Sequence, residues 1–377
     1  MPTLAAHLKR RIADEGPLSV ARFMEDALGH PRLGYYMGRD PFGRDGDFIT
    51  APEISQMFGE LIGLWCVVEW QAMGEPTPVN LVELGPGRGT LMADALRAGR
   101  GTEDFLESIS LSLVEISPAL KGLQEEVLLA AGDVRRVQSL RWLSDFSEIP
   151  EGPLLLIANE FLDVLPVHQF QMTADGWRER LVGLEDGKGE GGAEDGFRFV
   201  LDDAPPTDDR VLSDLADLAN LPGAGEGTVI EIRPRAQALI TDLARRLAET
   251  SGAALFIDYG HTETACGDTL QAVKGHHFQN PLDHPGEADI TAHVDFGAIG
   301  RAAADAGAQV LGPVSQASFL KNLEIDVRAE ALAAASPAHS QNIADGLKRL
   351  TSDEAMGQLF KVMALISPGM APPPGFE

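Results

Sequence analysis

The chain has 377 residues, more than one domain usually holds, so either one large elaborated domain or two domains are expected. Its formal net charge of -27 argues against a nucleic-acid partner, because phosphates would be repelled. Cys66 and Cys266 are too few for a disulfide framework or a four-cysteine metal site. The N-terminus lacks a signal-peptide pattern, and no segment approaches the ~20 apolar residues of a membrane span. We therefore expect a cytoplasmic protein without membrane insertion.

The N-terminal segment, residues 1–76, is predicted to be helical. Helical periodicity covers residues 3–13 and 19–28. After a glycine-rich, aromatic loop, Thr50 and Glu53 have the spacing of a capping box, which predicts a helix from there to about residue 73.

From residue 79 onward, apolar runs alternate with helical patterns, which is typical of a parallel sheet in an α/β fold. The predicted strands are 79–84, 111–115, 153–158, 253–258 and 308–314. A weaker strand pattern at 134–138 would supply an edge of a ligand pocket, with Asp133 before it, although an acid there is more often a turn residue.

The chain between the strands that end at 158 and 258 is longer than one crossover helix needs. It contains antiparallel strand patterns at 167–173, 177–184 and 197–201, and an acidic, glycine-rich stretch at 185–196 that predicts a surface loop. We therefore expect an inserted α+β subdomain, about 167–232, near the active site. The predicted division is 1–76, a core at 77–325, and a tail at 326–377 with one helix at 326–350 and a flexible end.

The most informative motif is the run from Val82 to Thr90. Glu83 ends an apolar strand, and three glycines follow it at 85, 87 and 89, with Pro86 and Thr90 in the same loop. Such glycines allow the backbone to approach a ligand closely, and the carboxylate of Glu83 suits an ammonium group. The run therefore predicts a site for the methionine end of S-adenosyl-L-methionine.

A dinucleotide-binding fold is the alternative for this motif. That fold requires G-x-G-x-x-G and an acid about 20 residues later. Here the spacing is G-x-G-x-G, and Glu115, which follows the second strand and suits a ribose diol, lies further along. The spacing and Glu83 favour a methyltransferase over a nicotinamide oxidoreductase.

A polar cluster follows the strand at 153–158. Asn159, Glu160 and Asp163 would lie at the carboxyl end of the sheet, where ligands of open parallel sheets bind. A guanidinium is planar, always charged and recognised by carboxylates, so Glu160 and Asp163 could hold one, with the Asn159 carbonyl as a further acceptor. Alternatively, Asn159 and Asp163 only cap the next helix and Glu160 is solvated.

Histidines are frequent in the C-terminal third, but their spacings match no metal signature, so we expect no metal site. His261, which follows a strand end at Asp258, is the candidate for a proton acceptor or an active-site wall. His293 could approach the same cleft.

Several long motifs, in order over about residues 15–325, resemble a known family. That family comprises the protein arginine methyltransferases that act as mitochondrial complex I assembly factors, together with their bacterial relatives. The motifs are Gly34-Tyr35-Tyr36, Gly46-Asp47-Phe48-Ile49-Thr50-Ala51-Pro52-Glu53-Ile54-Ser55-Gln56-Met57-Phe58-Gly59-Glu60, Glu83-Leu84-Gly85-Pro86-Gly87-Arg88-Gly89-Thr90, Asn159-Glu160-Phe161-Leu162-Asp163, Ile257-Asp258-Tyr259-Gly260 and Asp289-Ile290-Thr291-Ala292-His293-Val294-Asp295-Phe296.

The resemblance implies a class I, Rossmann-like, seven-stranded methyltransferase sheet and, for the mitochondrial members, symmetric dimethylation of an arginine in the quinone-side core subunit of complex I. It also implies that the segment 46–60 folds over the cofactor, which makes Thr50, Pro52, Glu53 and Ser55 candidate wall residues. A processed eukaryotic member would lie in the mitochondrial matrix. A non-catalytic assembly chaperone that retains the fold is the alternative function.

Overall fold

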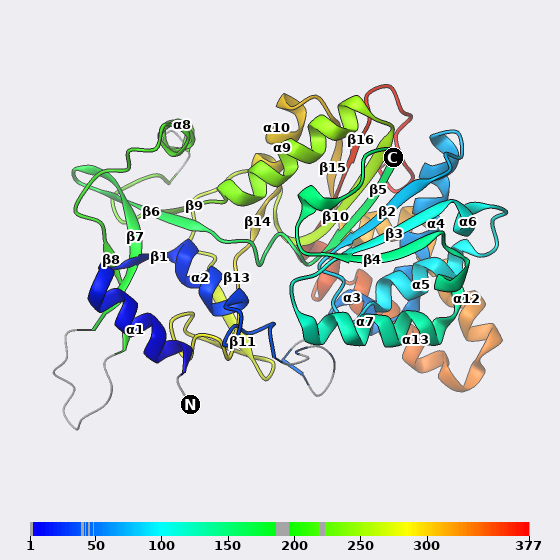
Figure 1. Cartoon of the computed structure of the whole chain (residues 1–377), viewed down its shortest axis with the longest axis horizontal. Helices are drawn as coiled ribbons and strands as arrows, with labels where there is room; N and C mark the ends of the chain where they lie inside the picture. The colour runs from blue at the N-terminus through cyan, green and yellow to red at the C-terminus, as the bar shows by residue number, and fades with distance from the viewer. Residues whose placement is uncertain are drawn as a thin grey trace.

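The computed structural model describes residues 3–38, 41, 43, 46–47, 49–185, 196–218 and 223–376. They form two lobes, which lie side by side in Figure 1. The core lobe contains the large sheet, and the second lobe contains two small sheets and the first two helices. The surface loop predicted at 185–196 lies almost wholly outside the described residues, as do Arg44, Asp45 and Phe48.

The large sheet is the predicted α/β sheet. Its strands are β2 (Val79–Leu84), β3 (Ile109–Val114), β4 (Ser139–Leu143), β5 (Leu154–Asn159), β10 (Gly252–His261), β15 (Gln309–Ser315) and β16 (Phe360–Ile366), with the short β14 (Val294–Asp295) paired to β10. In the described residues the order is β15-β16-β10-β5-β2-β3-β4. Strands β4, β3, β2, β5 and β10 are parallel, whereas β16 runs antiparallel to both neighbours. The predicted α/β fold is confirmed.

Strand β16 lies within residues 326–377, the segment predicted to be a tail. All its residues except Lys361 are buried, because it pairs with β10 on one side and β15 on the other. The helix predicted at 326–350 is two helices, α12 (Ile325–Ala335) and α13 (Ser340–Thr351). Even the chain end is anchored, since the ring of Phe376 lies 5.4 Å from that of Phe319, centroid to centroid. A seven-residue segment with six apolar residues and one lysine does not reveal such distant strand partners.

The weak strand prediction at 134–138 was wrong. Residues Asp133–Arg136 form the 3-10 turn η1, and the edge strand β4 begins at Ser139. Val134 is buried beneath this turn, so the apolar residues there serve packing rather than strand pairing.

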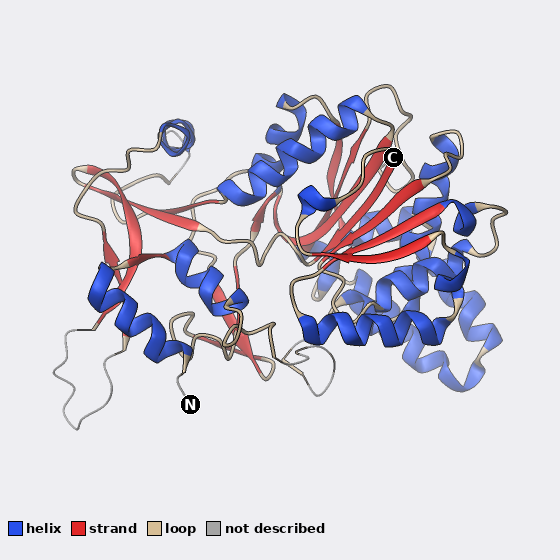
Figure 2. Ribbon diagram, viewed as in Figure 1, coloured by secondary structure: helices blue, strands red, loops and turns tan. Residues whose placement is uncertain are grey.

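Helices cover both faces of the large sheet (Figure 2). One face packs against α9 (Pro234–Glu249) and α10 (Phe296–Asp305). The other packs against a larger layer, formed by α4 (Gln56–Ala72), α5 (Thr90–Gly99), α6 (Phe105–Ser108), α7 (Pro118–Ala131), α11 (Gln316–Asn322), α12, α13 and α14 (Met356–Leu359). Helices α4 and α5 approach closely at Gly63, where a Cβ would lie 2.5 Å from the Cα of Ala95.

The helix predicted to begin at Thr50 is interrupted. A short helix, α3 (Ala51–Ile54), ends at Ser55, whose backbone is extended and whose hydroxyl caps α4 by accepting from Met57 N. Thr50 makes no side-chain cap. Glu53 instead contacts the glycine loop in the core lobe. The capping-box prediction was therefore wrong, because a tertiary contact replaced the local one.

The second lobe begins with α1 (Leu4–Glu15) and α2 (Val20–Gly29), close to the predicted helices. Its larger sheet contains β1 (Leu18–Ser19), β6 (His168–Thr173), β7 (Gly176–Leu184), β8 (Phe197–Leu201) and β9 (Val229–Ile232), and helix α8 (Asp209–Leu218) packs beside it. The predicted antiparallel strands are confirmed. A smaller sheet, β12-β11-β13, was not predicted; it consists of β11 (Gln271–Lys274), β12 (His277–Gln279) and β13 (Asp289–Thr291).

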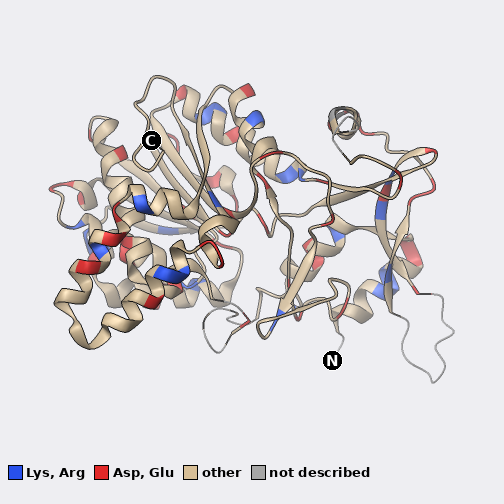
Figure 3. Ribbon diagram, turned by 180° about the vertical axis from the view of Figure 1, so that it is seen from behind, with Lys and Arg blue, Asp and Glu red and all other residues tan. Residues whose placement is uncertain are grey.

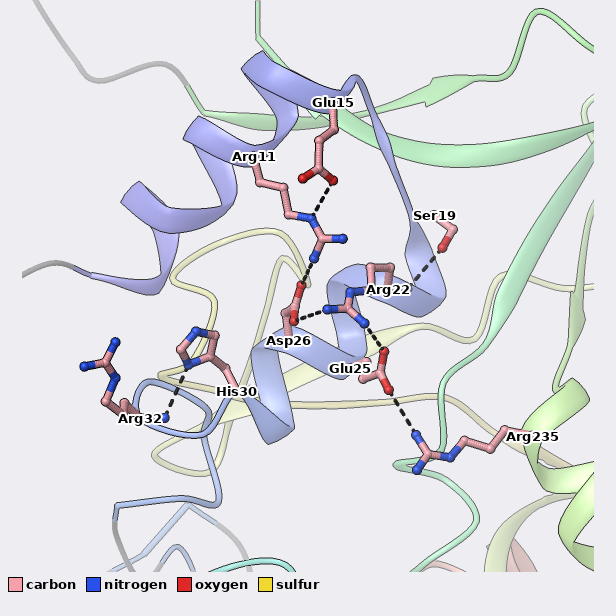
Figure 4. A network of polar contacts seen from close by, with 9 residues as sticks. All are labelled: Arg11, Glu15, Ser19, Arg22, Glu25, Asp26, His30, Arg32 and Arg235. Carbon is pink, nitrogen blue, oxygen red and sulfur yellow. Dashed lines mark hydrogen bonds and ion pairs between the residues drawn. The ribbon is translucent and has the colours of Figure 1, made fainter.

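A network of ion pairs on α1 and α2 reaches the core lobe through Arg235 (Figure 4). Arg11 of α1 and Arg22 of α2 bind opposite oxygens of Asp26, at 3.0 and 3.2 Å. Glu25, which also pairs with Arg22, reaches Arg235 of α9 at 3.1 Å. The exposed Glu25–Arg235 pair contributes at most about 1 kcal/mol to stability, so the contact between the lobes is stabilised mainly by packing.

The acidic residues are spread over both lobes (Figure 3).

Candidate active site

A cavity of about 580 Å³ lies between the lobes. Its core-lobe wall is the carboxyl edge of the large sheet, and its second-lobe wall includes Leu28 and Tyr36 together with residues of β11, β12 and β13. The insertion 167–232 contributes none of its strands to the lining. The cavity is lined instead by residues of the chain between β10 and α10.

The glycine loop forms part of the cavity wall. Gly85, Pro86, Gly87 and Thr90 line it, and Gly85 has φ +62°. A Cβ on Gly85 would lie 3.0 Å from the Phe161 ring, so the loop packs this closely against the ring only because a side chain is absent.

Glu83 lies beneath this loop and is 3% exposed. Among the described residues, nothing hydrogen-bonds its Oε2. Burial raises the pKa of Glu83 to about 8. A buried carboxylate with a free oxygen is an acceptor for a cation, and the ammonium of a methionine moiety is of this kind.

Glu115 lines the cavity after β3. Its Oε1 accepts from Ser117 N at 2.7 Å and its Oε2 from Gln124 Nε2 at 3.1 Å. The same Gln124 nitrogen donates to the Gly87 carbonyl at 2.8 Å, and Trp142 donates to the Gln124 oxygen. Gln124 thus ties the carboxylate to the glycine loop. Nothing in the sequence indicated this role, because Gln124 lies in the middle of α7 and belongs to no motif.

The segment 50–53 lies over the loop. Thr50, Pro52 and Glu53 line the cavity, and Glu53 accepts from Thr90 Oγ1 at 2.5 Å and pairs with Arg88 at 3.3 Å. Ser55 is not part of the lining, since it caps α4.

Two further predicted positions lie outside the lining. Gly89 has φ +84° and packs against Gln124 at the start of α5. Asp133 is also outside; Ser144, Asp145 and Phe146, which follow β4, line this side instead.

The structure also brings Asn159, Glu160 and Asp163 together in the lining of the cavity. Glu160 has φ +50°, a conformation that costs roughly 1–3 kcal/mol and is concentrated at functional sites. Its Oε1 accepts from Ala51 N at 3.3 Å and from Asn159 Nδ2 at 3.2 Å. Burial and the charge of Asp163 raise the pKa of Glu160 to about 8.

Asp163 is 3% exposed and oriented by Tyr259, whose hydroxyl donates to Oδ2 at 2.6 Å. Neither Oδ1 of Asp163 nor Oδ1 of Asn159 has a partner within the described part of the chain. The helix-cap alternative fails at these positions, since residues 160–167 form no helix. Burial raises the pKa of Asp163.

Asp258, three residues before the end of β10, is structural. Its Oδ2 accepts from the backbone N–H groups of Phe161, Leu162 and Asp163, at 3.1, 2.9 and 3.2 Å. It thereby shapes the turn that carries Asp163. Burial and the charge of Asp163 hold the pKa of Asp258 well above its ordinary value.

His261 does not line the cavity. Its Nε2 lies 4.0 Å from Asp295 Oδ2. His293 does line the cavity, with its ring 5.6 Å from that of Tyr259, centroid to centroid. Burial lowers the pKa of His293. Of the two histidines considered from the sequence, His293 is therefore the one in the lining of the cavity.

The described residues contain no group of three or more His, Cys, Asp or Glu side chains that could hold a metal ion. No helix among them is long and apolar enough to cross a membrane.

The fold and the cavity define a class I methyltransferase that uses S-adenosyl-L-methionine. Residues 61–314 match the model of a family described as putative S-adenosyl-L-methionine-dependent methyltransferases. A crystal structure of a likely methyl transferase from Burkholderia thailandensis, bound to S-adenosyl-homocysteine, is 34% identical over 99% of this chain and 93% of that one, with a TM-score of 0.85. The free oxygen of Glu83 and the glycine cradle fit this cofactor, which decides against the nicotinamide alternative.

Curated relatives specify the family. The mitochondrial protein arginine methyltransferase NDUFAF7 of Mus musculus is 40% identical over 96% of this chain and 83% of its own length. The Homo sapiens protein is 39% identical over 96% of this chain and 82% of its own. The chain belongs to the NDUFAF7-type protein arginine methyltransferase family.

Proposed function

We propose that this protein transfers a methyl group from S-adenosyl-L-methionine to an arginine of a protein substrate. The observation that carries the proposal is the pair of unpartnered acceptor atoms, Oδ1 of Asn159 and Oδ1 of Asp163, beside the carboxylate of Glu160 at the end of the cavity. Buried acceptors without donors match a ligand rich in N–H groups, and a guanidinium has five.

The cofactor end is assigned to residues of the core lobe. Glu83 binds the ammonium group, and Glu115 accepts from the ribose hydroxyls. The backbone of the loop 85–87 allows close approach, and Thr50, Pro52 and Glu53 cover it. When bound, S-adenosyl-L-methionine supplies a methyl group on a positively charged sulfur.

At the acceptor end, Glu160 and Asp163 accept hydrogen bonds from the guanidinium and fix its plane. This orients the lone pair of one nitrogen toward the methyl carbon, and such positioning can supply much of the rate. The nitrogen loses a proton after transfer, and a carboxylate whose pKa is raised, as in Glu160, is suited to accept it. His261 has no role here, because it lies off the cavity.

The resemblance found in the sequence extends the proposal to a particular substrate. We propose an arginine of the quinone-side core subunit of complex I. A net charge of -27 suits a basic segment of such a partner. The protein would then act where that subunit is assembled, in a bacterial cytoplasm or, for a eukaryotic chain, in the mitochondrial matrix.

The test is methyl transfer to the recombinant quinone-side subunit, followed by mass spectrometry for methylarginine. The wild type should modify an arginine, and Glu160→Gln should lose most turnover while it keeps its affinity for S-adenosyl-L-methionine. Binding of the subunit without methylation would favour the non-catalytic chaperone. Full turnover by Glu160→Gln would overturn the assigned role of that carboxylate.

A further inference from the structure

A carboxylate from the second lobe faces the acceptor end. Asp289, the first residue of β13, is 7% exposed and lines the cavity. Its Oδ1 accepts from the Tyr36 hydroxyl at 2.8 Å. Burial and the charges of Asp163 and Glu160 contribute to raising the pKa of Asp289 to about 8. All three carboxylates line the same cavity.

Ionising all three carboxylates in this cavity costs free energy unless a cation binds between them. Three acids sharing one buried site cannot all ionise at low cost, because like charges disfavour one another. The Tyr36 hydroxyl donates only one hydrogen bond to Asp289, which does not neutralise it. Asp163 is 3% exposed, and its Oδ1 accepts no hydrogen bond from the described residues. A ligand can supply the missing donor. The site is thus built for a positively charged donor.

The number and origin of the acceptors distinguish two possible cations. An ammonium is a compact point charge with three donors, whereas a guanidinium is a flat fork with five. Glu160 and Asp163 line the cavity from the core lobe and Asp289 lines it from the second lobe, so the acceptors belong to different elements. A flat cation with several donors can bind acceptors from both lobes at once.

We propose that Asp289, positioned by Tyr36, is the third carboxylate of the arginine pocket and makes it selective for guanidinium over ammonium. The inference rests on the proposed function. It gives a role to two sequence motifs, Tyr35-Tyr36 and the one that begins at Asp289, which meet only in the tertiary structure. It also means that the acceptor pocket is complete only when both lobes are in place.

The experiment measures binding rather than transfer. The full-length protein, saturated with S-adenosyl-homocysteine, is titrated with n-propylguanidinium, which is the arginine side chain, and with n-butylammonium, which is the lysine side chain. Ligand-observed NMR gives both dissociation constants, and calorimetry gives the affinity for S-adenosyl-homocysteine. The wild type should prefer the guanidinium.

Asp289→Asn keeps the shape of the side chain and removes its charge. We expect it to weaken n-propylguanidinium binding by about tenfold, to reduce the preference over n-butylammonium, and to leave S-adenosyl-homocysteine affinity unchanged. Tyr36→Phe should weaken guanidinium binding several-fold, but should have no further effect in the Asp289→Asn background, because it acts through that carboxylate.

Tyr35→Phe is the matched control. Tyr35 also donates to an aspartate, Asp47, at 2.7 Å, but neither residue lines the cavity. This variant should keep the guanidinium preference. The proposal is overturned if the wild type shows no preference, if Asp289→Asn binds both probes as the wild type does, or if it loses S-adenosyl-homocysteine to the same extent. A failure of methyl transfer with the preference intact would instead count against the proposed function.

Discussion

The Tyr259 hydroxyl donates to Asp163 Oδ2 at 2.6 Å and thereby joins the end of β10 to the turn after β5. The chain has three tyrosines, and each donates a hydrogen bond to an aspartate. Burial and neighbouring acids hold the pKa values of Tyr36 and Tyr259 well above the ordinary one, so both stay neutral donors. Asp163 and Asp289 line the cavity. In each, one carboxylate oxygen accepts from a tyrosine hydroxyl, and this hydrogen bond orients the other oxygen.

Cofactor affinity should depend on pH through Glu83. The pKa of Glu83 is about 8, and an ammonium requires the ionised form, so binding below pH 8 must release a proton. At pH 7 we expect about one proton released from Glu83 per cofactor bound, measured by calorimetry in buffers of different ionisation enthalpy. Affinity should fall as pH decreases from 7.5 to 6.

Glu83→Gln should lower the affinity and abolish this proton release. Glu75→Gln, at an exposed glutamate outside the cavity, should change neither. An equal proton count in wild type and Glu83→Gln would contradict the assignment.

Glu160→Gln should stabilise the cofactor-free protein at high pH while it abolishes transfer. The pKa of Glu160 is raised from 4.5 to about 8, so the folded state retains a proton that the unfolded state loses. The free energy of unfolding therefore falls as pH rises from about 4.5 to 8. Glu160→Gln has no carboxyl group to ionise, so its stability does not fall in this way. We expect its free energy of unfolding to exceed that of the wild type by about 1–2 kcal/mol at pH 8 and to differ little at pH 5.

Denaturant unfolding at the two pH values measures this difference. Glu126→Gln, at an exposed position on α7, serves as the control and should follow the wild type at both. If Glu160→Gln lost stability at pH 8, the carboxylate would be a net stabilising partner rather than a strained one.

Gln124→Ala should weaken S-adenosyl-L-methionine binding several-fold, because the amide holds both Glu115 and the Gly87 carbonyl. It should also lower stability, since it leaves buried polar groups unpaired. Gln316→Ala is the matched control: Gln316 is 0% exposed and donates to the Leu350 carbonyl at 2.9 Å, away from the cavity. Calorimetry on both variants separates the effects, and equal cofactor affinities in the two would refute a role for Gln124 at the site.

Phe278→Ala should weaken recognition of the protein substrate. Phe278 is 77% exposed and lines the cavity from β12, where a peptide that carries the target arginine would pass. We expect KM for the protein substrate to rise several-fold, with KM for the cofactor and thermal stability nearly unchanged. Val327→Ala, at a 59% exposed valine outside the lining, should leave all three unchanged. An unaltered substrate KM in Phe278→Ala would remove this residue from the docking surface.

The features that the sequence by itself determined are those with a local cause. A buried parallel strand followed by Glu83 and spaced glycines is recognisable, because the strand pattern and the turn requirement lie within a few consecutive residues. The same holds for the cluster at Asn159, Glu160 and Asp163, since a strand end places whatever follows it at the ligand-binding edge. The antiparallel strands of the insertion also follow from local alternation.

Only the tertiary structure decided which distant segments meet. The pairing of β16 between β10 and β15, the approach of Tyr36 to Asp289 and the hold of Gln124 on the glycine loop all join segments whose separation along the chain carries no periodic signal. The choice of His293 over His261 likewise depended on where the chain turns after β10. Such contacts arise from burial and packing of whole elements, which local propensity does not encode.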